Sequence, residues 1–333
     1  NVPNVVPNTT MNPVDYLGWN QGDPGWNNLT ASGSNYVYLG DGWVLSARHV
    51  GYNATSGVTL QTMLPDGSPG PVQTFYRIPG SYYHDYGYAQ GSTRHYAVSN
   101  PTTVQSEGGQ TISLQASNGA YFTDLQLFRI NGDPGLPALT LSASPLGTDF
   151  TRETAPEVVM VGLGQGRREA ESHWNVTQVT SDQWTWTPVV GGGTHHGYRH
   201  DGIATKRWGT NRLADPRPNG PGDPVDEGAI NHTSLFEGII SDTSAVMPLT
   251  TGDGVTRRVV SLMTVYDSQS SPGATSLEFQ GIGGNSRSGE FFNRDGQWEL
   301  AGIVNAIVRY PNQPNATIFG NSTIISDLSF YTQ

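Results

Sequence analysis

The decisive stretch is Gly40-Asp41-Gly42-Trp43-Val44-Leu45-Ser46-Ala47-Arg48-His49-Val50, in which a histidine closely follows an apolar segment. Val44 and Leu45 suit a buried β-strand, and the small residues after them suit a tight turn. Such a strand is a rigid base from which His49 would reach a cleft. A lone histidine at a strand end is more often structural than catalytic. A catalytic interpretation therefore needs an orienting carboxylate and a nucleophile elsewhere in the chain.

Both groups have candidates further along the sequence. Residues 122–130 alternate apolar and polar side chains, as a half-buried strand does, and Asp124 lies near the start of this segment. Near the C-terminus, Ser286 and Ser288 lie in a glycine-rich loop that precedes the segment Trp298-Glu299-Leu300-Ala301-Gly302-Ile303-Val304. Serine is common in such turns. The two serines become informative only through their order after the histidine and the carboxylate.

Taken together, these motifs resemble those of the trypsin-like, chymotrypsin-fold serine proteases, in the same chain order. These motifs lie within about residues 33 to 333, and the long stretches of sequence between them do not match the family pattern. It implies that His49 is the general base, that Asp124 orients it and that Ser286 is the nucleophile. It also implies an oxyanion hole formed by the backbone N–H groups of Gly284 and Ser286.

The nucleophile loop departs from the family pattern around Ser286. This serine lies twelve residues before Trp298, as the pattern implies, whereas choosing Ser288 would put Arg287 at the acidic position. With Ser286 chosen, Asn285 replaces the acidic residue, so activation through a freed N-terminus is not expected. Arg287 and Ser288 replace glycines, which would strain any turn that needs a positive φ. The alternative to an enzyme is an inactive protease fold with an extracellular structural, self-assembling or binding role.

The resemblance further implies a substrate pocket. Gln280 lies six residues before the nucleophile, at the pocket floor, so no carboxylate is expected there to bind a Lys or Arg side chain. Asn305 and Ile307 fall on the strand that would pair with the substrate, and Ile307 should narrow the pocket mouth. We expect a protein or peptide substrate with a small or medium neutral residue before the scissile bond.

Composition favours an all-β fold, because the 333 residues include 42 glycines, 22 prolines and many short β-rich runs. The resemblance implies two antiparallel six-stranded β-barrels of the chymotrypsin/trypsin type. We expect an extended N-terminal arm at 1–30, a first barrel at 31–145 with the base and its carboxylate, and a second barrel at 146–333 with the nucleophile. The arm would become ordered by packing on the body or on a neighbouring copy, and strand addition to a neighbour would give a homo-oligomer.

Charge and composition also exclude some partners. A net charge of −11 makes nucleic acid and anionic membranes unsuitable. No apolar run approaches the roughly 20 residues that a membrane-spanning helix needs. The absence of cysteine rules out disulfides and favours a bacterial origin. The start at asparagine fits a processed protein that is secreted or extracellular. The periplasm and the cell surface are alternative locations.

A second constellation is Thr194-His195-His196-Gly197-Tyr198-Arg199-His200, which places three histidines within six residues. Neutral imidazoles suit zinc, copper or nickel. The segment follows three consecutive glycines, and neither a cysteine nor a suitably spaced carboxylate accompanies it. A polar loop is therefore the preferred interpretation, and the sequence assigns no metal or other cofactor.

Overall fold

The computed structural model describes residues 9–49, 57–81, 83–84, 102–119, 124–147, 150–217, 235–250, 254–283 and 285–331. These residues form antiparallel sheets with very little helix, so the all-β expectation is confirmed. The helices are η1 (Pro13–Asp15), η2 (Trp26–Asn28) and α1 (Leu328–Tyr331). No helix in the described ranges has the length and apolarity to cross a membrane.

The first sheet brings the histidine and the carboxylate to one edge. Its strand order is β1 (Val37–Gly40), β2 (Trp43–Ala47), β8 (Leu125–Arg129) and β5 (Tyr83–His84). Two hairpins lie outside this ladder: β3 (Val58–Met63) with β4 (Pro69–Phe75), and β6 (Thr103–Gln105) with β7 (Thr111–Ser113). Antiparallel pairing of β2 with β8 sets Ala47 opposite Leu125. The residue two positions after β2 and the residue just before β8 therefore meet.

The second sheet contains the nucleophile loop, which precedes β17. Its order is β12 (Gln183–Val189), β11 (Ser172–Thr180), β13 (His195–Arg212), β10 (Glu157–Arg167), β17 (Gly289–Arg294), β18 (Gln297–Val308), β20 (Ser322–Asp327), β16 (Thr256–Val265), β15 (Ala245–Thr250) and β14 (Gly238–Ile239). Two further strands join it: β19 (Ala316–Ile318) beside β13, and β9 (Thr140–Leu141) beside β18. An isolated bridge joins Leu213 to Thr264. No continuous ladder among the described strands closes this sheet.

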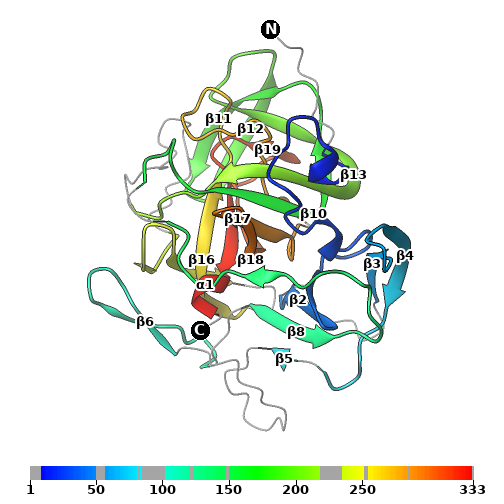
Figure 1. The fold of residues 1–333 in the computed structure, drawn as a ribbon. Helices are drawn as coiled ribbons and strands as arrows, with labels where there is room; N and C mark the ends of the chain where they lie inside the picture. Colours follow the sequence, from blue (N-terminus) through cyan, green and yellow to red (C-terminus); the bar gives the residue numbers. More distant parts are fainter. Residues whose placement is uncertain are drawn as a thin grey trace.

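A shared apolar core joins the two sheets. Val37 and Leu45 of the first sheet pack in one cluster with Val161, Phe291 and Ile303 of the second, and all five side chains are at most 3% exposed. Burying each side chain of this size contributes about 1.5–3 kcal/mol. Figure 1 shows β2 and β8 beside the β17–β18 region, where this core lies. The core therefore holds the loop before β17 against the end of β2.

The described part of the N-terminal arm, residues 9–30, packs on the second sheet of the same chain. The Tyr16 ring meets Trp208 edge-on at 5.4 Å between centroids, and Trp19 stacks on Trp298 at 5.9 Å. Trp298 Nε1 also donates to the carbonyl of Gln21 at 2.6 Å. In Figure 1 this dark blue segment lies beside β10 and β13. The described residues of the arm thus contact the protein body, while strand addition to a neighbour stays a prediction.

Candidate active site

Three side chains from two sheets meet in one chain of hydrogen bonds. His49 Nδ1 lies 2.6 Å from Asp124 Oδ2, and His49 Nε2 lies 3.0 Å from Ser286 Oγ. Both distances lie within the range required between a nucleophile, its base and the group that orients the base. The structure therefore brings together the three residues that the motifs selected, across separations of 75 and 237 positions in the sequence.

Asp124 is held by the backbone of the histidine segment. Its Oδ1 accepts from the His49 N–H at 2.8 Å, and its carbonyl accepts from the Arg48 N–H at 2.8 Å. Its side chain is fully buried, and its φ of 60° lies in the left-handed region that aspartate tolerates better than most residues. An ionised carboxylate can only accept hydrogen bonds. If Asp124 is ionised, His49 Nδ1 donates to it, and in this tautomer the Nε2 lone pair faces Ser286.

Asn285 ties the nucleophile loop to β10. Its side-chain Oδ1 accepts from the Ile282 N–H at 2.9 Å, and its Nδ2 donates to the Leu163 carbonyl at 3.0 Å. Its backbone carbonyl accepts from the Ser288 N–H at 2.9 Å. An ionised aspartate would have no donor for Leu163. The neutral amide at this departure from the family pattern therefore matches its surroundings and needs no charged partner.

Two glycines of β10 make room for this loop. A Cβ added at Gly162 would lie 1.9 Å from Ser288 Oγ, and one added at Gly164 would lie 2.4 Å from Asn285 Nδ2. Both separations are far below any normal contact. Ser288, which stands where the family pattern has a glycine, is thus accommodated because the residue of β10 that faces it, Gly162, has no side chain. The segment Gly162-Leu163-Gly164 was the signal in the sequence, but its meaning depends on which loop packs against it.

Arg287 shows the backbone strain expected of this loop, and Ser288 does not. Arg287 has φ 77°, in the left-handed region, whereas Ser288 is not among the described residues with positive φ. The conformation costs about 1–2 kcal/mol for a residue with a Cβ. Its guanidinium lies over the Tyr36 ring at 4.7 Å, and the residue is only 2% exposed. A cation–π contact of this kind contributes about 0.5–2 kcal/mol and offsets the strain.

Of the two residues expected to form the oxyanion hole, the structure describes Ser286 only. Gly284 lies outside the described residues, so nothing is stated of its amide. Within the described residues, the Ser286 N–H has no recorded hydrogen-bond acceptor. The oxyanion-hole assignment stays a prediction.

The residues expected to form the pocket divide into two groups. Gln280 lines a cavity of about 140 Å³, together with Ile282 and Asn285 of the nucleophile loop. Both polar side-chain atoms of Gln280 are buried and have no hydrogen-bond partner within the described residues. Asn305 and Ile307 are not among the described residues that line this cavity. Asn305 is 3% exposed and donates to Ser326 Oγ at 2.9 Å.

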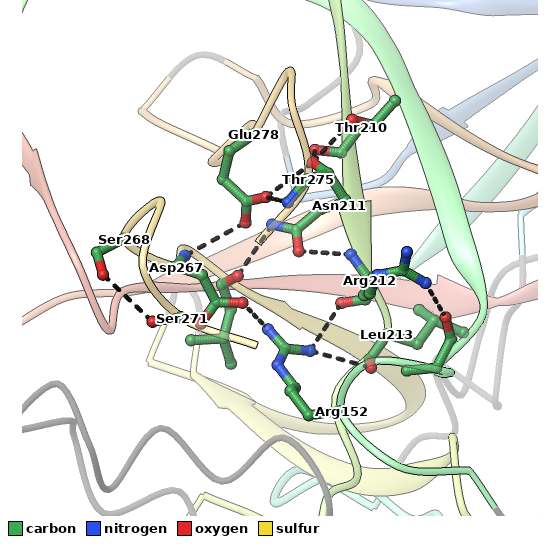
Figure 2. Close-up of polar contacts among 12 residues, drawn as sticks. Arg152, Thr210, Asn211, Arg212, Leu213, Asp267, Ser268, Ser271, Thr275 and Glu278 are labelled. Carbon is green, nitrogen blue, oxygen red and sulfur yellow. Dashed lines mark hydrogen bonds and ion pairs between the residues drawn. The ribbon is translucent and has the colours of Figure 1, made fainter. Parts of the chain in front are cut away.

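A polar network includes Asp267 and Glu278, two of the residues that line the cavity (Figure 2). Glu278 accepts from the Asp267 N–H at 3.2 Å, and from the N–H and hydroxyl of Thr275 at 2.8 Å each. Asp267 is also paired with Arg152. Burial, followed by the charge of Asp267, raises the pKa of Glu278 to about 8. This carboxyl group is therefore mostly protonated at neutral pH.

The three histidines of the 194–200 segment do not converge on one point. His195 packs edge-on against Tyr310, at 4.9 Å between centroids. His200 bonds to Asn315 and Thr317 through its two ring nitrogens. Burial lowers the pKa of His195 and of His200 below the ordinary value. His196 instead contacts Glu171, a carboxylate that lies 25 positions earlier in the sequence.

No family model matches this chain, and a search of the curated proteins finds no matching protein. A functional interpretation therefore depends on the geometry of the site and on the motif pattern.

Proposed function

We propose that this protein is a serine endopeptidase of the trypsin-like type. The main support for this proposal is the continuous hydrogen-bond chain from Ser286 Oγ through His49 to Asp124, with contacts of 3.0 and 2.6 Å. Ser286 attacks a peptide carbonyl while His49 takes its proton and then gives it to the leaving amine. Asp124 holds the histidine tautomer and stabilises the imidazolium. Water, activated by the same histidine, then releases the acyl group from the serine.

Strand pairing in the second sheet supports one of the two barrels that belong to this proposal, whereas the described first sheet has four strands. The β2–β8 pair places the base and its carboxylate at one sheet edge. In the second sheet, six consecutive antiparallel strands run in the order β13-β10-β17-β18-β20-β16. An isolated bridge also joins Leu213, the residue that follows β13, to Thr264 of β16, the last strand of that series. We therefore interpret these six strands as the second barrel of the fold.

The charges around Gln280 support cleavage after a neutral residue. Gln280 provides an amide instead of a carboxylate, and its polar atoms have no described partner. Two carboxyl groups line the same cavity, but Asp267 is paired with Arg152 and Glu278 is mostly protonated at neutral pH. A Lys or Arg side chain would therefore meet little free negative charge. Profiling with a peptide library tests this, and dominant cleavage after Arg or Lys would overturn it.

A fluorophosphonate probe tests the proposed chemistry directly, because it reacts with serines that an adjacent base activates. We expect one adduct, located at Ser286 by mass spectrometry. Ser286→Ala should abolish labelling, and His49→Ala should reduce it at least a hundredfold. Ser288→Ala serves as the matched control and should still be labelled. A folded, unlabelled wild-type protein would favour the inactive scaffold, with a structural or binding role.

A secreted location stays a prediction that fractionation of the producing cells would test.

A further inference from the structure

A cluster outside the proposed active site combines two histidines and a carboxylate. In the antiparallel pairing of β11 with β13, His173 lies directly opposite His196. Glu171 precedes His173 by two residues, and side chains two apart along an extended chain point to the same face. The pairing register thus places all three on one side of the β11–β13 ribbon.

The ligand atoms of the cluster are already close to one another. One nitrogen from each histidine and one carboxylate oxygen of Glu171 all lie within 4.8 Å. Glu171 Oε1 bonds to His196 Nδ1 and lies 3.9 Å from His173 Nε2. The two imidazole rings are nearly parallel, with 6° between their planes and 5.8 Å between centroids. All three residues are part-exposed, so an ion could reach them from solvent.

We propose that Glu171, His173 and His196 bind a divalent transition-metal ion, for which Zn²⁺ is the probe. Bonds of about 2.0–2.2 Å in tetrahedral geometry put neighbouring donor atoms roughly 3.3–3.5 Å apart. The 3.9 Å contact is close to this spacing, so small side-chain rotations complete the set. Two imidazoles and one carboxylate suit zinc better than hard ions such as Mg²⁺, which prefer oxygen donors.

Metal binding here would act on the β11–β13 ribbon. Three protein ligands leave one position of a tetrahedral ion for water. The His196 ring also meets Phe319 edge-on at 4.9 Å, which limits its rotation. An ion held by residues of both strands would fasten β11 to β13. It would therefore raise the unfolding temperature without entering the hydrolytic chemistry.

Isothermal titration calorimetry of the chelator-treated full chain with ZnCl₂ tests the proposal, together with the shift in unfolding temperature. We expect one Zn²⁺ per chain. His173→Ala and His196→Ala should each weaken binding at least tenfold and remove the thermal shift, and Glu171→Gln should weaken it less. His200→Gln is the control, because His200 lies on the same strand outside the cluster.

Circular dichroism establishes that each variant is folded. Wild-type protein that binds no stoichiometric Zn²⁺ would overturn the proposal, as would equal loss of binding in His200→Gln. Fluorophosphonate labelling of Ser286 tests the proposed protease function independently of Zn²⁺ binding. The failure of one proposal can therefore be told apart from the failure of the other.

Discussion

Gly162 lies so close to Ser288 that a Cβ on the glycine would be only 1.9 Å from the serine Oγ. The absent side chain on β10 makes room for the extra side chain in the nucleophile loop. The pair explains how a loop that departs from the protease pattern still presents Ser286 at 3.0 Å from His49.

The first prediction tests this pair with a double-mutant cycle. Gly162→Ala should force the loop away from β10 and lower Ser286 labelling at least tenfold. Ser288→Gly alone should have little effect. In the double variant Gly162→Ala/Ser288→Gly, labelling should largely recover, because the clashing Oγ is gone. Kinetics of fluorophosphonate labelling measure all four proteins, and a double variant no better than Gly162→Ala would contradict the prediction.

The second prediction separates strain from contact at Arg287. Arg287→Ala loses the contact with Tyr36 and keeps a Cβ in the left-handed region. Arg287→Gly loses the same contact but relieves the strain, so it should be more stable than the alanine variant by about 1 kcal/mol. Urea unfolding of both variants gives the difference. Equal stabilities would mean that the backbone at this position is not strained.

The third prediction concerns pH and Glu278. Its pKa of about 8 in the folded protein exceeds its ordinary value of 4.5. The folded state then holds a proton that the unfolded state releases, so stability falls as pH rises from about 4.5 to about 8. Glu278→Gln removes this titration, and its unfolding temperature should fall less than that of the wild type over this range. Parallel pH profiles of the two proteins would contradict the prediction.

The fourth prediction concerns Glu290, whose carboxyl group is fully buried and has no hydrogen-bond partner within the described residues. Burial raises the pKa of Glu290 well above its ordinary value. Glu290→Leu should stabilise the protein by about 1–3 kcal/mol at pH 8, because it removes a buried polar group that lacks a partner. Glu290→Gln, which keeps a polar group there, should gain less. A destabilised leucine variant in urea unfolding would indicate that the carboxyl group has a partner.

The fifth prediction concerns the N-terminal arm. Trp19→Ala removes the stacking on Trp298 and the edge contact with Trp208, so it should lower the free energy of unfolding by about 1–3 kcal/mol. Leu17→Ala is the matched control, because the Leu17 side chain is 97% exposed and its loss should change little.

Light scattering tests separately whether the arm mediates assembly. Monomers that are unchanged on deletion of residues 1–30 would contradict the expected homo-oligomer.

Strand patterns and the order of the motifs could be recognised in the sequence. Alternating side chains identified the strand that follows Asp124, and an apolar run identified the strand that precedes His49. A period of two residues is a local property of a strand, so it can be recognised without knowing the neighbours. The sequence by itself therefore determined the all-β class, and the resemblance of its motifs to those of trypsin-like proteases selected the three side chains that meet at the site.

Only the tertiary structure decided which distant residues face one another. The pairing register of β11 with β13 sets His173 opposite His196, whereas the sequence suggested only the histidines at 195, 196 and 200. The packing of β10 on the nucleophile loop likewise gives Gly162 its role. Neither relationship has a local signature, because cross-strand neighbours depend on register and on long-range packing, and a shift of one residue would turn every side chain to the other face.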